Sequence, residues 1–145
     1  MGALRDGFEY KRGGQGLSYP FAEGPKIGGG VEIAPGVVWM RMPLGGSLAY
    51  NNVWGLKDEG GWTLVDTGLN GPATTEAWRT AFAGALGGEP IVRVIVTHMH
   101  PDHIGMAGWI ARKFACRLWI TRLEYLMCRV MAADTGREAT GSNHR

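Results

Sequence analysis

The sequence predicts an α/β fold, and three observations support that prediction. Short runs rich in aromatic and β-branched residues occupy the first half of the chain, as in antiparallel strands. From residue 72 onward, apolar residues recur at the spacing of amphipathic helices. Between two of these helical stretches lies a nearly continuous apolar run, typical of a strand buried in a parallel sheet. Alternating strands and helices are typical of the α/β class.

Size and composition exclude several classes of protein. The chain has 145 residues, 45% of them hydrophobic and 19% charged, so it has room for one globular domain and is not mainly disordered. Fifteen Lys and Arg against 13 Asp and Glu give a net charge of +2, and the basic residues are scattered, so we expect no nucleic-acid partner. Apolar runs fall far short of the roughly 20 residues that cross a membrane, so we expect no membrane partner.

Glycine and proline recur through residues 1–30, and we expect this segment to be irregular. The glycines at 28–30 predict a turn, because the Gly-Lys-Ser/Thr ending and the following helix of a phosphate-binding loop are missing. The folded domain is expected over residues 31–136. A polar tail is expected over residues 137–145.

Three strands are predicted in the first half of the domain. The first lies within residues 31–42, where the apolar run 37–40 is bounded by Pro-Gly on one side and Pro on the other. Two more are predicted at 47–56 and 62–66 from their aromatic and β-branched residues. The Gly-containing connection at 57–61 predicts that these two strands form a hairpin.

Helices and strands alternate in the prediction for the rest of the chain. In order, these are a helix at 72–86, a strand at 91–97, a helix at 102–114, a strand at 118–120 and a helix at 121–136. Thr121 and Glu124 match a capping box at the start of the last helix. We expect the apolar stripes of all three helices to face the core rather than a cofactor.

Three histidines and an aspartate lie within six residues, directly after the predicted buried strand 91–97: His98, His100, Asp102 and His103. Imidazole and carboxylate are suitable ligands for a divalent metal such as zinc. His98 and His100, two residues apart, can point to one ion, while the turn into the helix can carry Asp102 and His103 toward a second. A solvated histidine-rich loop, or a helix start capped by Asp102, is the alternative. Four ligand-type residues at this spacing favour a metal site.

The order His-x-His-x-Asp-His at residues 98–103 resembles the signature of the metallo-β-lactamase superfamily. Residues 63–68, Thr-Leu-Val-Asp-Thr-Gly, resemble the strand of that superfamily that ends in Asp-Thr-Gly. The resemblance covers residues 31–136. It implies a partial αββα sandwich: a mixed sheet with helices on one face, the metal site at an edge between two sheets, and the second half of the sandwich missing.

The resemblance also implies roles for individual residues. His98 and His100 would bind the first metal, and Asp102 and His103 the second. Asp102 would also act in catalysis by taking a proton from the metal-bound water or by orienting that water. Asp66 would support the site from behind the ligands, although a strand-end residue that caps a turn remains an equal alternative.

The implied mechanism is metal-assisted hydrolysis, in which a metal-bound hydroxide attacks a carbonyl or phosphoryl centre. Zinc is the expected cofactor, as one or two ions, and iron or manganese also suits a mixed His and Asp set. Full-length members supply a third His, a bridging Asp and a final His from the second half of the chain. This chain ends before those positions, so we expect it to be the N-terminal half of a metallo-hydrolase. His144, in the polar tail, is not expected to be a ligand.

Three functions remain open from the sequence. The first is hydrolysis of an ester, thioester or lactone of a small molecule. The second is metal binding without catalysis, and the third is self-association through a sheet face that the missing half leaves exposed. A β-lactamase ranks lower because no export signal is visible, and a nuclease ranks lower because no basic stripe is visible. A cytoplasmic location is expected, with Cys116 and Cys128 reduced.

Overall fold

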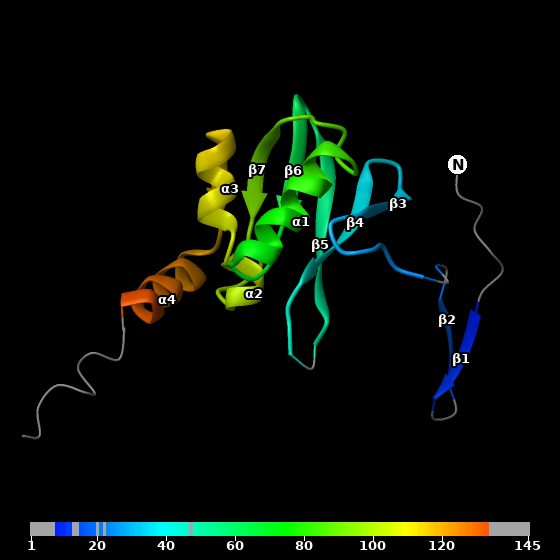
Figure 1. Cartoon of the computed structure of the whole chain (residues 1–145). Helices are drawn as coiled ribbons and strands as arrows, with labels where there is room; N and C mark the ends of the chain where they lie inside the picture. Colours follow the sequence, from blue (N-terminus) through cyan, green and yellow to red (C-terminus); the bar gives the residue numbers. More distant parts are fainter. Residues whose placement is uncertain (1–7, 13–14, 20, 22, 47, 134–145) are drawn as a thin grey trace, which may run out of the picture.

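A computed structural model describes residues 8–12, 15–19, 21, 23–46 and 48–133. The strands are β1 (Phe8–Arg12), β2 (Gln15–Tyr19), β3 (Gly30–Ala34), β4 (Val37–Pro43), β5 (Tyr50–Asp58), β6 (Gly61–Val65), β7 (Ile91–Ile95) and β8 (Arg117–Trp119). The helices are α1 (Pro72–Ala83), α2 (Pro101–Ile104), α3 (Ala107–Phe114) and α4 (Arg122–Ala133) (Figure 1). No helix among the described residues is long and apolar enough to cross a membrane.

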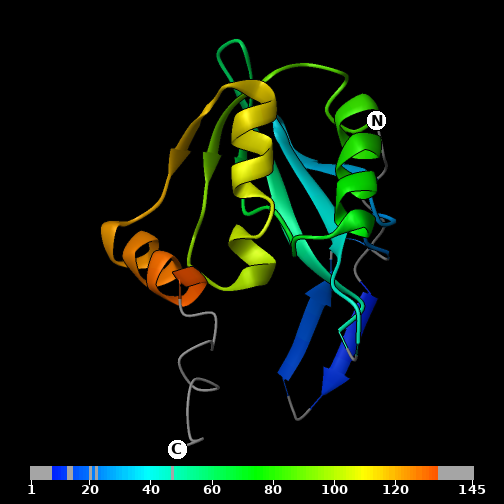
Figure 2. The same cartoon turned by 60° about the vertical axis from the view of Figure 1, so that its left-hand side comes forward.

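The main sheet has six strands in the order β3-β4-β5-β6-β7-β8. β3 to β6 are antiparallel neighbours, whereas β7 and β8 continue the sheet in parallel after helical crossovers. Helices α1 and α3 cover the same face of this sheet (Figure 2). The predicted α/β class, with a mixed sheet and helices on one face, is therefore confirmed.

The N-terminal segment differs from the prediction. β1 and β2 pair as an antiparallel hairpin in which Phe8 is opposite Tyr19 and Arg12 is opposite Gln15. The expectation that residues 1–30 are irregular is therefore wrong for these two strands. A pair of glycines between two stretches that contain β-forming residues is also a hairpin signal, and it accounts for the difference. The predicted polar tail, residues 137–145, lies outside the described residues.

The core lies between the helices and the covered face of the sheet. Alternate residues of β4, namely Val38, Met40 and Met42, point into it because side chains alternate along a strand. Trp78 of α1 is 0% exposed and stacks on Phe82, with 5.1 Å between the ring centroids. The expectation that apolar stripes face the core is confirmed for α1 and α3, whose buried apolar residues belong to this core.

Where one helix was predicted at 102–114, the structure has two, α2 and α3, separated by Gly105 and Met106. The backbone at Gly105 packs tightly against the turn that follows β6. A Cβ atom there would lie 2.7 Å from the carbonyl oxygen of Gly68 and 2.5 Å from the amide nitrogen of Asn70. The Met106 amide donates to the Gly68 carbonyl oxygen at 3.2 Å. This contact redirects the chain between α2 and α3.

Helix α4 contradicts the expected burial of its apolar stripe. None of its residues, all of which the structure describes, is buried. Its exposed apolar residues are Leu123, Tyr125, Leu126, Met127, Val130 and Met131. The amphipathic pattern correctly predicted a helix but did not predict what it packs against.

Candidate metal centre

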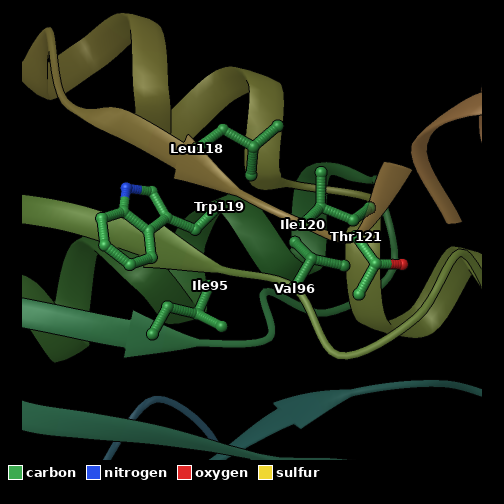
Figure 3. A pocket seen from close by; sticks show the side chains of 6 residues that line it. All are labelled: Ile95, Val96, Leu118, Trp119, Ile120 and Thr121. Atoms are coloured by element: carbon green, nitrogen blue, oxygen red, sulfur yellow. The ribbon is translucent and has the colours of Figure 1, made fainter. Parts of the chain in front are cut away.

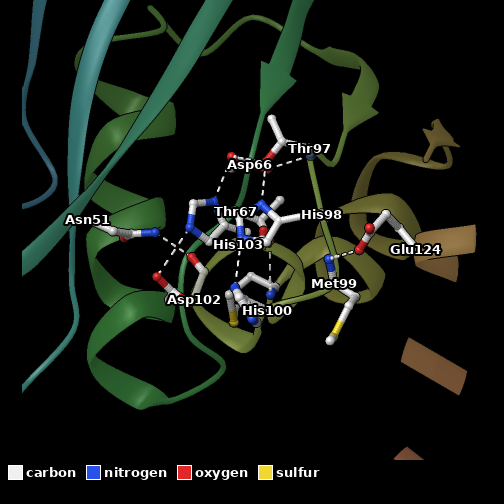
Figure 4. A network of polar contacts seen from close by, with 11 residues as sticks. Asn51, Asp66, Thr67, Thr97, His98, Met99, His100, Asp102, His103 and Glu124 are labelled. Atoms are coloured by element: carbon white, nitrogen blue, oxygen red, sulfur yellow. Dashed lines mark hydrogen bonds and ion pairs between the residues drawn. The ribbon is translucent and has the colours of Figure 1, made fainter. Parts of the chain in front are cut away.

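The predicted ligands lie beside the carboxyl ends of β6 and β7: His98 and His100 in the loop that leads into α2, and Asp102 and His103 in α2 itself (Figure 4). The Asp66 amide donates to the Ile95 carbonyl oxygen at 2.9 Å, which holds the two strand ends together. The Thr67 amide and hydroxyl both donate to the His103 carbonyl oxygen, at 2.8 and 2.7 Å. These bonds attach the turn after β6 to α2, so residues far apart in sequence meet at one edge of the sheet.

The Trp78 indole, which lies in the core, holds the turn that follows β6. Its Nε1 donates to the carbonyl oxygen of Thr67 at 2.7 Å. Trp78 and Thr67 are both fully buried, and an unpaired carbonyl oxygen would be costly at such a position. The core therefore positions the Asp-Thr-Gly turn, and through it the candidate site.

Asp66 connects two of the strand ends with its carboxylate. Oδ1 accepts hydrogen bonds from the Thr97 amide at 2.8 Å and from the Thr97 hydroxyl at 3.0 Å. Oδ2 lies 2.8 Å from Nδ1 of His103. Asp66 has a positive φ of 62°, a conformation that non-glycine residues adopt infrequently and that aims this carboxylate at both partners.

The contact with Asp66 determines how His103 can act. When Nδ1 donates to the carboxylate, the lone pair of the neutral ring lies on Nε2. Nε2 of His103 is 3.3 Å from Oδ2 of Asp102. A carboxylate that accepts from the distal nitrogen of a ligating histidine is a recurrent support for metal ligands. The same carboxylate also accepts a hydrogen bond from the Thr97 amide at the end of β7.

The three imidazoles are close together. The ring centroids of His98 and His103 are 4.0 Å apart, and those of His98 and His100 are 4.7 Å apart. Nδ1 of His98 lies 2.9 Å from the Thr97 hydroxyl, and Nε2 of His98 lies 2.9 Å from Nδ1 of His100. The structure thus brings together all four predicted ligands, His98, His100, Asp102 and His103.

The type of donor fits a divalent metal, but the spacing is not that of a formed site. Among the described residues, no group of three or more His, Cys, Asp or Glu side chains is arranged to hold a metal ion. Two imidazole nitrogens on one tetrahedral zinc lie about 3.3 Å apart, because each Zn–N bond is about 2.0–2.1 Å. The 2.9 Å contact between His98 and His100 is shorter than this. Metal binding would require these two rings to separate by a few tenths of an ångström.

Sequence reasoning missed two residues that contact the site. Nδ2 of Asn51, on β5, donates to the Asp102 carbonyl oxygen. Its Oδ1 is buried and has no hydrogen-bond partner among the described residues. Glu124 of α4 accepts a hydrogen bond from the Met99 amide at 2.7 Å. No sequence signal distinguishes Asn51 from its neighbour Asn52, and for Glu124 the sequence predicts only a capping box.

An apolar hollow of about 490 Å³ opens at the carboxyl ends of β7 and β8. It is lined by Ile95, Val96, Leu118, Trp119, Ile120 and Thr121 (Figure 3). Val96 lies two residues before His98, and Thr121 directly precedes α4. The hollow therefore lies next to the segments that carry the histidines and Glu124.

The chain is similar to known proteins of one superfamily. The family model of the metallo-beta-lactamase superfamily matches residues 47–140. None of the curated proteins compared with the chain matches it.

Several solved structures are similar to the chain. A beta-lactamase domain protein from Burkholderia ambifaria is 44% identical with a TM-score of 0.74, over 79% of this chain and 36% of that protein. A metallo-beta-lactamase family protein from Thermus thermophilus is 25% identical with a TM-score of 0.61, over 74% of this chain and 36% of that protein. A metallo-beta-lactamase from Hirschia baltica, at 21% identity, has a TM-score of 0.56 over 71% of this chain and 47% of that protein. The last similarity concerns the fold alone.

Proposed function

The chain belongs to the metallo-β-lactamase superfamily, and from that premise we propose that it carries part of the site of a zinc-dependent hydrolase of small-molecule esters, thioesters or lactones. Membership supports a metallo-hydrolase in general. The chain spans 36% of the length of the first two solved structures above. The observation that carries the proposal is the meeting of three imidazoles and the Asp102 carboxylate beside the β7 end, supported by Asp66.

Each residue has a distinct role in this proposal. His98, His100 and His103 would hold the metal together with Asp102, and Asp66 keeps Nε2 of His103 available. A bound divalent ion would lower the pKa of a water molecule and polarise the substrate carbonyl. The Asp102 side chain is 29% exposed, so its carboxylate can accept a proton at the site and pass it to solvent.

The apolar hollow supports a small substrate with an apolar part. Its lining is mostly aliphatic and aromatic, with the Thr121 hydroxyl as the polar exception. Small-molecule sites are typically apolar with a few polar groups that fix orientation. An acyl group of an ester or thioester matches this lining better than a charged nucleic-acid backbone does.

Metal content of the tag-free protein after dialysis tests the proposal first. We expect one or two ions per chain, with zinc predominant over iron and manganese, and loss of the metal in His98→Ala and in Asp102→Ala. Glu59→Gln is the control, because Glu59 is an exposed residue of the β5–β6 turn. Less than about a tenth of an ion per wild-type chain would contradict the proposal.

Hydrolysis of a panel of esters, thioesters, lactones and β-lactams then tests the reaction. We expect turnover of an ester, thioester or lactone that is lost in His98→Ala and retained in Glu59→Gln. Metal binding with no turnover of any member would favour the catalytically silent metal-binding alternative. Turnover restricted to β-lactams would contradict the proposed substrate class.

The exposed apolar residues of α4 favour self-association as a second candidate function. An apolar surface of this kind is commonly buried in a contact with another molecule. Sedimentation at several protein concentrations tests it, and a monomer at every concentration would contradict it.

We further propose a cytoplasmic location, which localisation of the tagged full-length gene product in intact cells would check.

A further inference from the structure

Glu124 lies in the first turn of α4, and its carboxylate contacts the loop that carries two of the histidines. Oε2 of Glu124 accepts a hydrogen bond from the Met99 amide at 2.7 Å, between residues 25 positions apart. Met99 is the one residue between His98 and His100. The bond therefore holds the peptide that joins the two imidazoles (Figure 4).

A capping box alone does not explain this contact. The Glu124 amide donates to the Thr121 hydroxyl at 3.3 Å, which is one half of a capping box. In the other half, the glutamate carboxylate would return to the backbone amide of the capping residue. Here the carboxylate of Glu124 is directed instead to the Met99 amide on a different element.

The backbone around the histidines is held by a series of such contacts. The Val96 amide donates to the Trp119 carbonyl oxygen at 2.9 Å, and the Thr97 amide donates to Oδ1 of Asp66 at 2.8 Å. The next amide in this series is that of Met99, which donates to the carboxylate of Glu124. The Glu124 contact is thus the one of these three that lies between His98 and His100.

We propose that Glu124 is a positioning residue of the metal site, which orients His98 and His100 by holding the Met99 amide. This inference rests on the proposed function. A hydrogen bond from an amide to an ionised carboxylate is stronger than one between neutral groups, so the bond restricts the loop before metal binds. Without this hydrogen bond, metal binding itself would have to order the two imidazoles, and metal affinity would be lower.

The test compares Glu124→Ala with Glu124→Gln, in which an amide oxygen can still accept from Met99. Zinc affinity is measured by competition with a chromogenic chelator, and the visible spectrum of the cobalt-substituted protein reports ligand geometry. We expect Glu124→Ala to weaken zinc binding by about 10–100-fold, the range found for residues that support metal ligands, and to alter the cobalt spectrum. Glu124→Gln should recover most of the affinity and the wild-type spectrum.

Thr121→Ala is the matched control for a merely structural role. It removes the hydroxyl that caps α4 but leaves the Glu124 carboxylate in place. We expect Thr121→Ala to lower the helix content of α4 and to change zinc affinity much less than Glu124→Ala. Should Glu124→Ala not fold, Glu124→Asp, with a side chain one methylene shorter, takes its place in the comparison.

Hydrogen exchange of the Met99 amide in the metal-free protein tests the hydrogen bond to Glu124 directly, and the zinc titration separates this inference from the proposed function. Protection of that amide should be lost in Glu124→Ala and retained in Glu124→Gln. If the wild type binds zinc but Glu124→Ala matches it in affinity and cobalt spectrum, the inference is wrong and the proposed function stands. If the wild type binds no metal, the proposed function fails and the inference fails with it, whatever the exchange pattern.

Discussion

Nδ1 of His103 lies 2.8 Å from the carboxylate of Asp66, and this contact joins the end of β6 to α2. The Asp66 side chain is 8% exposed, so the contact is largely shielded from water. The same carboxylate receives the Thr97 amide from the end of β7. One residue at a left-handed backbone position therefore organises two of the segments that carry the predicted ligands.

Asp66→Asn should weaken zinc binding by about 10–100-fold, because an amide accepts the His103 proton less strongly than a carboxylate does. Chelator competition measures the affinity, and nitrogen chemical shifts of the imidazoles report which ring nitrogen of His103 carries the proton. Asp58→Asn is the control, since Asp58 lies at the far end of β5 and contacts Thr63. Equal zinc affinity in Asp66→Asn and wild type would show that Asp66 only caps the turn.

Trp78→Phe should destabilise the fold by about 1–3 kcal/mol, because it leaves the buried Thr67 carbonyl oxygen unpaired while keeping the aromatic stack on Phe82. Trp78→Ala should cost more, about 3–5 kcal/mol, because it also creates a cavity. Urea unfolding measures both values. Trp119→Phe is the comparison, since Trp119 is 51% exposed and should change stability little. Equal losses at positions 78 and 119 would contradict this account.

Local sequence signals predicted the elements that depend on local chemistry. The period of apolar residues located α1, and a nearly continuous apolar run located β7, with the predicted ligands directly after it. The partners of those ligands could not be predicted in the same way. Asn51 and Glu124 contact the motif across 51 and 25 positions, and both contacts depend on how the strands and α4 are arranged in space.

The break at Gly105 shows the same limit of local reasoning. Its φ of −53° is helical, and the periodic apolar residues on both sides of it predict one continuous helix. The Met106 amide, however, donates to the Gly68 carbonyl oxygen on a distant turn, and the chain leaves the helical path there. Burial of α4 was likewise predicted from an apolar stripe, which indicates that a partner is needed but not where that partner lies.

Helix propensity and close packing predict opposite signs for the change in unfolding free energy of Gly105→Ala. Helix propensity alone predicts stabilisation of about 1 kcal/mol, whereas the close backbone atoms of Gly68 and Asn70 predict destabilisation of about 1–3 kcal/mol by overpacking. We expect destabilisation, measured by urea unfolding. Gly71→Ala is the control, since no atom outside its immediate neighbours lies within 4 Å of the added Cβ. A more stable Gly105→Ala would refute the packing argument.

Asp58 should titrate below its ordinary pKa of 3.8. The Thr63 hydroxyl lowers the pKa most, followed by the Glu59 amide and the charge of Arg93. A carboxylate with a lowered pKa stabilises the fold above its unfolded pKa, and this stabilisation is lost as pH falls through the folded pKa. We expect carboxyl chemical shifts to show the lowered pKa in wild type and a pKa nearer to 3.8 in Thr63→Val. An unchanged pKa in Thr63→Val would contradict the assignment of the main cause.

Two helix positions of similar chemistry should respond differently to truncation. Ile110 of α3 is 0% exposed and Val130 of α4 is 62% exposed. Ile110→Ala should cost about 2–5 kcal/mol of unfolding free energy, because it leaves a cavity beneath the sheet. Val130→Ala should stay within about 0.5 kcal/mol in dilute protein, since surface changes rarely do more. A large loss at Val130 that grows with protein concentration would instead mean that α4 is buried between copies of the chain, because association adds to the apparent stability of whatever it covers.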